Sequence, residues 1–306
     1  MKSSEKLKWG ALALLVTSIW AMAFISMKVA GENFSPAQVM LIRTVIAYIC
    51  LLAVYPKFHK VESLKQELLY FIGGLCSTTL YTITINSAYK YTEVANVSVI
   101  ASLSPIFVAL FTPLFIKGEK YKKSVFLGFI IATFGTVVIA TGGTFRLKVS
   151  AVGDTIALMS AMIWGFYSVI LKKNNTKYPQ FYVTRRMFLY GILAVIPVIL
   201  YESTHGNPIA WGALKSWPVA LNFLFLGLVP YVFCHVCIGL VIKHMGPVWT
   251  SKFSYLEPVI TMILSFFILS EAITLPKVIG AAFILLGVMV SDEVFKKKKS
   301  EVQAES

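Results

Sequence analysis

Residues 94–116 read VANVSVIASLSPIFVALFTPLFI, a run of 23 residues that contains no Lys, Arg, Asp or Glu. A transmembrane helix needs about 20 consecutive apolar residues to cross the hydrocarbon core of a bilayer. This run meets that length, and Lys90 and Lys117 flank it as lysines flank many membrane spans. The stretch therefore predicts a helix that crosses a membrane.

The rest of the chain repeats this pattern of apolar runs and short polar connections. Hydrophobic residues make up 57% of the 306 residues and charged residues only 14%, whereas soluble domains carry about 25% charged residues. The sequence therefore predicts an all-α membrane protein with ten transmembrane helices. Their approximate positions are 9–27, 34–56, 68–89, 94–116, 124–145, 155–171, 179–201, 216–242, 247–269 and 276–294.

The Lys and Arg residues indicate the orientation of the helices. With the N-terminus placed inside, eighteen of them fall in cytoplasmic segments, six in outer segments and four within spans. Cytoplasmic loops of membrane proteins carry such an excess of positive charge. The bias predicts a cell-membrane protein with both termini in the cytoplasm. It also explains the net charge of +14 without a nucleic-acid partner.

The two halves of the chain align with each other at an offset of 143 to 153 residues. Such internal similarity indicates a duplicated five-helix unit. Because five is odd, the second unit crosses the membrane in the opposite sense, which predicts two inverted five-helix repeats. The equivalent residues are Trp20 and Trp164, Lys28 and Lys172, Pro36 and Pro179, Arg43 and Arg186, Lys90 and Lys243, Pro105 and Pro258, Glu119 and Glu271, Gly128 and Gly280, and Gly135 and Gly287.

The segments 105–135 and 258–287 each have a Pro, an apolar run, a Glu at the helix end and then a Gly-x6-Gly pair. This pattern resembles the EamA-type branch of the drug/metabolite transporter superfamily, over nearly the whole chain. The resemblance implies transport of amino acids, metabolites, nucleotides or drugs. The expected domains are a first repeat at 8–145, a second repeat at 151–294 and a basic, polar cytoplasmic tail at 295–306.

The inverted repeat favours a secondary transporter that moves a small-molecule substrate across the lipid bilayer by alternating access. The sequence has no Gly-x4-Gly-Lys-Ser/Thr loop for ATP. We therefore expect a solute, proton or ion gradient as the driving force, no cofactor and no enzymatic activity, in a monomer or homodimer. The alternatives are a membrane enzyme that acts on a lipid-linked substrate, and a receptor or assembly subunit that transports nothing.

Two arginines are expected deep within spans, at equivalent places in the two repeats. Arg43 and Arg186 each lie seven residues beyond the proline that begins their helix, which is a depth of about 10 Å. A charge at the centre of a membrane costs at least about 2.5 kcal/mol. We expect these side chains to bind an anion or act as gates. The alternative is that they reach back to the near interface.

Lys252 and Glu257 are the other charged candidates for a substrate-binding or gating role. Lys252 lies five residues beyond Pro247, so it could equally reach the inner surface. Glu257 precedes Pro258, whose ring removes a backbone hydrogen bond, and its carboxylate could bind a substrate amine, relay a proton or serve only the structure. The excess of cations over carboxylates favours solutes that carry a carboxylate or phosphate.

Several uncharged side chains in the spans are further candidates. Trp20, Trp164, Asn86 and His235 could line a cavity, although most aromatic rings in such a chain contact lipid or neighbouring helices. The sequence Cys234-His235-Val-Cys237 predicts no metal site, because a second ligand cluster is missing. Glu119 and Glu271, at helix ends, are expected to be structural. The paired glycines near each of them are expected to allow close helix packing.

Overall fold

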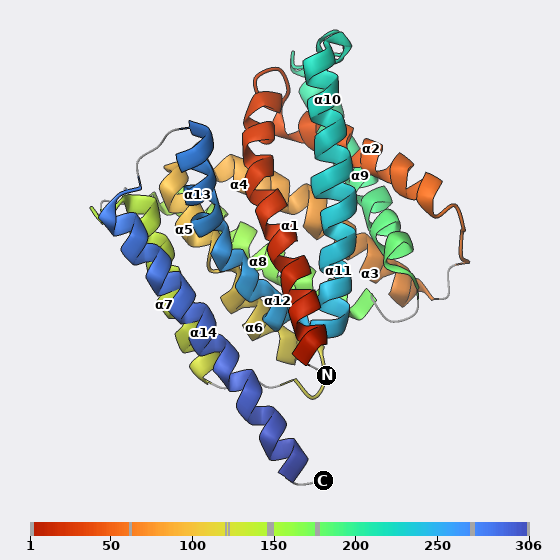
Figure 1. Ribbon diagram of the computed structural model, residues 1–306. Helices are drawn as coiled ribbons and strands as arrows, with labels where there is room; N and C mark the ends of the chain where they lie inside the picture. The colour runs from red at the N-terminus through yellow and green to blue at the C-terminus, as the bar shows by residue number, and fades with distance from the viewer. Residues whose placement is uncertain are drawn as a thin grey trace. The chain divides into compact units, whose positions relative to one another are not determined.

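The computed structural model describes residues 3–60, 63–119, 121, 123–145, 150–174, 178–269 and 273–304. In these ranges the regular structure is entirely helical, which confirms the predicted all-α fold (Figure 1). The first half contributes α1 (Ser3–Ala30), α2 (Pro36–Val54), α3 (Leu64–Gly74), η1 (Leu75–Leu80), α4 (Tyr81–Ala88), α5 (Val94–Ala101), α6 (Ser104–Phe115) and α7 (Lys123–Thr141).

The second half of the chain follows the same order of helices. It contributes α8 (Ala151–Asn174), α9 (Gln180–Thr204), η2 (Ala213–Lys215), α10 (Trp217–Leu226), η3 (Gly227–Phe233), α11 (Cys234–Met245), α12 (Pro247–Ser251), η4 (Lys252–Leu256), α13 (Glu257–Leu269) and α14 (Leu275–Ala304). The π-helices η1 and η3 and the 3₁₀-helix η4 continue their neighbours without a loop. Only the two-residue turn at residues 102–103 separates α5 from α6, so they count as one stretch, and the described helices form ten stretches, five in each half, apart from the short η2.

Seven of the described helices are long and apolar enough to cross a membrane. A shorter apolar helix covers Leu275–Ser291. Because hydrocarbon offers no hydrogen-bond partners, a spanning segment must satisfy its backbone internally, as a helix does. The seven helices are 36–54, 64–88, 96–115, 123–141, 151–174, 180–204 and 217–245.

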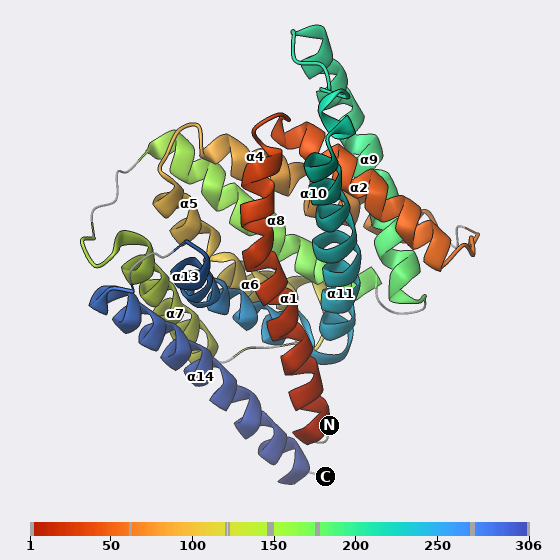
Figure 2. The ribbon, with the colours of Figure 1, turned by 45° about the horizontal axis from the view of Figure 1, so that its top comes forward.

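The chain divides into two compact units, and each unit takes segments from both halves of the sequence. The first consists of residues 1–86 and 170–244, and the second of residues 87–169 and 245–306. Helices at equivalent places in the two repeats therefore lie within the same unit, except for α1 and its repeat mate α8, most of which belongs to the second unit. Both views show α2 beside α9 in the first unit and α7 beside α14 in the second (Figures 1 and 2).

In the first unit the two π-helices make equivalent contacts. The helix α9 packs on η1, and its repeat mate α2 packs on η3, the repeat mate of η1. A Cβ atom added to Gly227, at the start of η3, would lie 3.1 Å from the carbonyl oxygen of Arg43. One added to Gly74, just before η1, would collide with the carbonyl oxygen of Met187. A glycine thus lets each arginine-bearing helix approach a π-helix closely.

In the second unit α7 and α14 cross in antiparallel fashion through two glycine contacts. A Cβ atom added to Gly128 would lie 2.6 Å from the carbonyl oxygen of Gly287, and one added to Gly135 would lie 2.5 Å from that of Gly280. Gly128 is the repeat mate of Gly280, and Gly135 that of Gly287. Exchanging the repeats therefore converts each contact into the other, as at a two-fold interface. This is the packing role predicted for these glycines.

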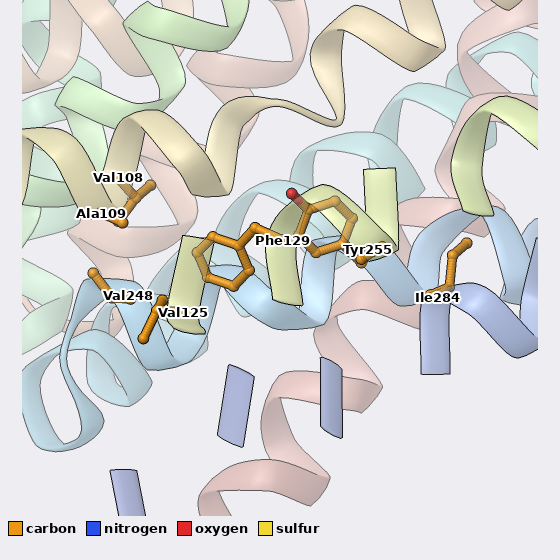
Figure 3. Close-up of a cluster of buried hydrophobic side chains, with 8 residues drawn as sticks. Val108, Ala109, Val125, Phe129, Val248, Tyr255 and Ile284 are labelled. Atoms are coloured by element: carbon orange, nitrogen blue, oxygen red, sulfur yellow. The ribbon is translucent and has the colours of Figure 1, made fainter. Parts of the chain in front are cut away.

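The core of the second unit surrounds this crossing. Phe129 of α7 packs against Tyr255 of η4, with 5.6 Å between ring centroids (Figure 3). The Tyr255 hydroxyl lies 3.1 Å from the Thr133 hydroxyl, which satisfies its buried polar atom. The other members of the cluster are Val108, Ala109, Val125, Ala132, Val248 and Ile284.

The α7–α14 crossing predicts that a large side chain at Gly135 destabilises the protein. Gly135→Leu must push the two helices apart, and overpacking costs about 1–3 kcal/mol or more. We expect a lower Tm for the purified protein in detergent. Gly212→Leu is the matched control, because Gly212 has φ −61° and open space around its added Cβ. Equal Tm values for the two variants would contradict the tight crossing.

Candidate functional site around Arg43

The first turn of α2 fixes the position of Arg43 along the helix. The Ser35 hydroxyl accepts a hydrogen bond from the Gln38 backbone N–H, and the Gln38 side chain accepts one from the Ser35 N–H, both at 3.2 Å. This capping box, with Pro36 next to it, starts the helix at a defined residue. The Arg43 side chain is only 9% exposed. It therefore lies buried among neighbouring side chains.

Sulfur and aromatic atoms surround the Arg43 guanidinium. Its Nη1 lies 2.7 Å from the sulfur of Met27, and its Cζ lies 4.2 Å from the ring centroid of Tyr231. Its Nε is buried and has no hydrogen-bond partner, and no carboxylate pairs with Arg43 among the described residues. A thioether is a weak acceptor, and a cation–π contact contributes about 0.5–2 kcal/mol. These contacts compensate poorly for the burial of a charge.

The π-helix η3 places the aromatic residues of this site. Pro230 lies inside η3, and its carbonyl oxygen accepts hydrogen bonds from two rings, Trp20 Nε1 at 3.3 Å and His235 Nδ1 at 3.1 Å. Because Nδ1 donates a hydrogen bond to this carbonyl, Nε2 of the neutral His235 ring carries no proton and can act as an acceptor. π-Helices occur frequently at functional sites.

Arg43 and five neighbouring side chains form a single cluster from four parts of the first unit. The His235 ring lies 5.9 Å from the Trp20 ring and 5.3 Å from the Phe188 ring. The Tyr231 ring lies 5.4 Å from that of Phe188 and 4.9 Å from that of His235. We name this group the Arg43 cluster; its members are Trp20, Met27, Arg43, Phe188, Tyr231 and His235.

Arg186, the repeat mate of Arg43, has an acidic partner. Its Nε donates to Glu67 Oε1 at 2.7 Å and its Nη2 lies 2.5 Å from the same oxygen. The Tyr190 hydroxyl donates to this oxygen as well. The side chains of Arg186 and Glu67 are 25% and 17% exposed. This pair ties α9 to the first turn of α3, where a carboxylate is favourable.

Arg185 is buried but fully engaged with backbone. It donates to the carbonyl oxygens of Tyr55 and, at 2.8 Å, Lys57, in the segment that follows α2. Its guanidinium also lies 4.7 Å from the ring centroid of Phe58. Of the three arginines in these spans, Arg43 alone has no oxygen acceptor among the described residues.

The structure distributes the eight candidates predicted from the sequence between the two units. The first unit holds Trp20, Arg43 and His235 in one cluster, and Arg186 in its own ion pair. It also holds Asn86, whose Nδ2 donates to the Thr82 carbonyl of the same helix at 2.7 Å. The second unit holds Trp164, Lys252 and Glu257.

The candidates in the second unit have distinct surroundings. Trp164 lies 5.3 Å from the ring of Tyr167. Lys252 is 4% exposed, and its Nζ lies 4.5 Å from the ring centroid of Trp249. Glu257 begins α13, directly after the 3₁₀ segment, and makes no hydrogen bond or ion pair with the residues that the structure describes. Lys252 therefore belongs to η4 rather than to one continuous α-helix with Glu257.

The two helix-end glutamates and the possible metal ligands complete the survey. Glu119 accepts a hydrogen bond from the Tyr121 hydroxyl at 3.0 Å, and burial, with the Glu119 charge second, raises the pKa of Tyr121 above its ordinary value. Glu271 lies outside the described residues. Within the ranges described, no group of three or more His, Cys, Asp or Glu side chains could hold a metal ion.

The sequence analysis did not identify Met27, Phe188, Tyr231 or Glu67. The one sequence signal for this part of the site was Pro230, a proline inside a long apolar run. It indicates an interrupted helix, and the structure places η3 there.

Ten helical stretches in two repeat-related sets define a multi-pass membrane protein, and comparison with known proteins gives its family. The EamA-like transporter family model matches residues 7–141 and 151–291. The chain therefore belongs to the EamA-like transporter family and is a membrane transporter, as its resemblance to the drug/metabolite transporters implied.

Relatives named as transporters match almost the full chain. An "Uncharacterized transporter" of Clostridium kluyveri is 27% identical over 95% of this chain and 95% of its own length. One from Archaeoglobus fulgidus is 26% identical over 92% and 96%. A "Probable terminal-alkyne amino-acid exporter" of Streptantibioticus cattleyicolor is 24% identical over 94% and 93%. A solved crystal structure shares the fold, with a TM-score of 0.76 and 22% identity over 95% and 97% of the two chains.

The Arg186–Glu67 pair predicts energetic coupling between α9 and α3. In a double-mutant cycle, Glu67→Gln and Arg186→Gln are expected to show a coupling free energy of about 0.5–3 kcal/mol, because they belong to one hydrogen-bonded network. Thermal unfolding of the four proteins measures it. The cycle of Glu67→Gln with Arg185→Gln is the matched control and should give a value near zero. Equal coupling in both cycles would contradict a specific pair.

The contrast between Arg43 and Arg185 predicts opposite effects on stability. Arg185→Met leaves two backbone carbonyls unpaired and should lower the stability by about 1–3 kcal/mol. Arg43→Met removes a buried charge that no oxygen stabilises, so we expect a Tm equal to or above that of the unmodified protein. A comparable loss of Tm in both variants would show that Arg43 serves the fold.

Proposed function

We propose that the protein is a secondary transporter that carries a small polar solute across the cell membrane by alternating access between its two inverted repeats. Both termini lie in the cytoplasm in this proposal, as the Lys and Arg distribution favours. The driving force is the gradient of the solute or of a coupled ion, because the sequence lacks a nucleotide-binding loop.

The observation that carries the proposal is the pairing of repeat-related helices within each unit. In the crossing of α7 and α14, exchanging the repeats converts one glycine contact into the other. Two equivalent halves with opposite orientation have two related conformations of similar energy, one open to each side. Membership in a transporter family and the names of the relatives support the transport function itself.

The substrate class that best fits is an amino acid or a similar small metabolite. The Arg43 cluster offers a buried cation for the carboxylate of such a solute and aromatic rings for its apolar part. The name of the Streptantibioticus cattleyicolor relative, an amino-acid exporter, supports this class.

The experiment is transport by purified protein in liposomes against a panel of radiolabelled amino acids and related metabolites. We expect saturable uptake of at least one solute, and faster exchange when the same solute is present on both sides. This acceleration distinguishes a carrier from a channel, because the loaded carrier returns more readily than the empty one. Protein-free liposomes are the control. Uptake that does not saturate or accelerate would overturn alternating access.

A further inference from the structure

The free edge of the Arg43 guanidinium has the geometry that binds a carboxylate. The Nε–H and one Nη2–H of an arginine point in the same direction and donate to the two oxygens of a carboxylate. In Arg43 the sulfur contact involves Nη1, and Nε has no acceptor. Among the described residues, no oxygen hydrogen-bonds to this edge, although the side chain is only 9% exposed.

The other two arginines show what this chain supplies when an arginine is structural. Arg186 receives the Glu67 carboxylate, and Arg185 receives two backbone carbonyls. A buried donor without an acceptor costs about 1–3 kcal/mol, and more when it is charged. The acceptor that the fold does not provide for Arg43 is therefore expected from a ligand.

We propose that the Arg43 cluster binds the carboxylate of the transported solute, with the Arg43 guanidinium as its counter-ion and the Trp20, Phe188 and Tyr231 rings against its apolar part. This inference rests on the proposed transport function and deepens it. Arg43 is the only group of fixed charge in the cluster, so a single negative charge neutralises it. A phosphate dianion would leave one charge uncompensated in the same place.

Met27 is the flexible neighbour of the Arg43 guanidinium, and its sulfur contacts Nη1. Its thioether is a weak acceptor on a flexible side chain with three rotatable bonds, and such a group moves at little cost. A carboxylate at the Nε–Nη2 edge forms charge-assisted hydrogen bonds, and the sulfur contact at Nη1 does not occupy that edge. Movement of Met27 would also free Nη1 for the same ligand.

The test compares carboxylic acids with their neutral amides in binding to the purified full-length chain. The pairs are L-leucine and L-leucinamide, L-phenylalanine and L-phenylalaninamide, and benzoate and benzamide, with phenyl phosphate as a separate arm. The rise in Tm on adding each compound identifies the acid–amide pair to study, and titration calorimetry then measures the Kd of both compounds. We expect at least one acid to bind about tenfold or more tightly than its amide, since hydrogen bonds to charged groups are strong.

Three variants assign this selectivity to a residue. Arg43→Gln should reduce the acid-to-amide ratio to about one, while Arg43→Lys should retain part of it because the charge remains. Arg186→Gln is the matched control: it removes another arginine of the same unit, and the ratio should persist. Arg43→Met provides the folding reference, because its Tm reports whether loss of this charge damages the fold.

Three results would overturn the inference. The first is that every acid binds with the same affinity as its amide, or that nothing in the panel binds. The second is that Arg43→Gln leaves the affinity for the acid unchanged. The third is that phenyl phosphate binds and the carboxylates do not. Liposome transport assays distinguish failure of the carboxylate-site inference from failure of the proposed transport function. Saturable, accelerated transport of a neutral solute by both the unmodified protein and Arg43→Gln would preserve the transporter and exclude the carboxylate site. Acid-selective binding without any transport would preserve the carboxylate site and exclude the transporter.

Discussion

The helical hydrogen bond governs this molecule, because hydrocarbon supplies no partner for a free backbone group. At both π-helices, side chains donate hydrogen bonds to backbone carbonyl groups. The Thr78 hydroxyl donates to the Gly74 carbonyl at 2.6 Å beside η1, and the Pro230 carbonyl in η3 receives two aromatic ring donors. Polar side chains therefore lie beside the π-helices, and the Arg43 cluster forms at one of them, η3.

The pairing of repeat-related helices follows from duplication with inversion. A helix and its inverted copy present the same small residues in antiparallel order, so the glycines of one face those of the other. In α7 and α14 this brings backbone into contact with backbone, an approach that only glycine permits. The arginines do not obey this equivalence, because Arg43 lacks the oxygen partner that Arg186 has. Symmetry thus shapes the scaffold, and the departure from it marks the candidate site.

The sequence predicted the features that depend on period, length and charge. It predicted ten helices, the inverted repeat and the packing role of Gly128. It did not predict that Glu67 pairs with Arg186, because 119 residues separate them and only the packing of α3 on α9 brings them together. The π-helix η3 was also missed, since a proline in an apolar run indicates an interruption without its geometry. The surroundings of each charge therefore required the structure.

The composition of the two compact units has a consequence for how the protein is made. Each unit combines early and late segments of the chain, so neither can finish packing while its second part is still on the ribosome. The glycine face of α7, with Gly128 and Gly135, has no packing partner in this unit until α14 has been synthesised. A chain truncated before α14 would leave this glycine face open, a form that membrane quality-control proteases can recognise and degrade.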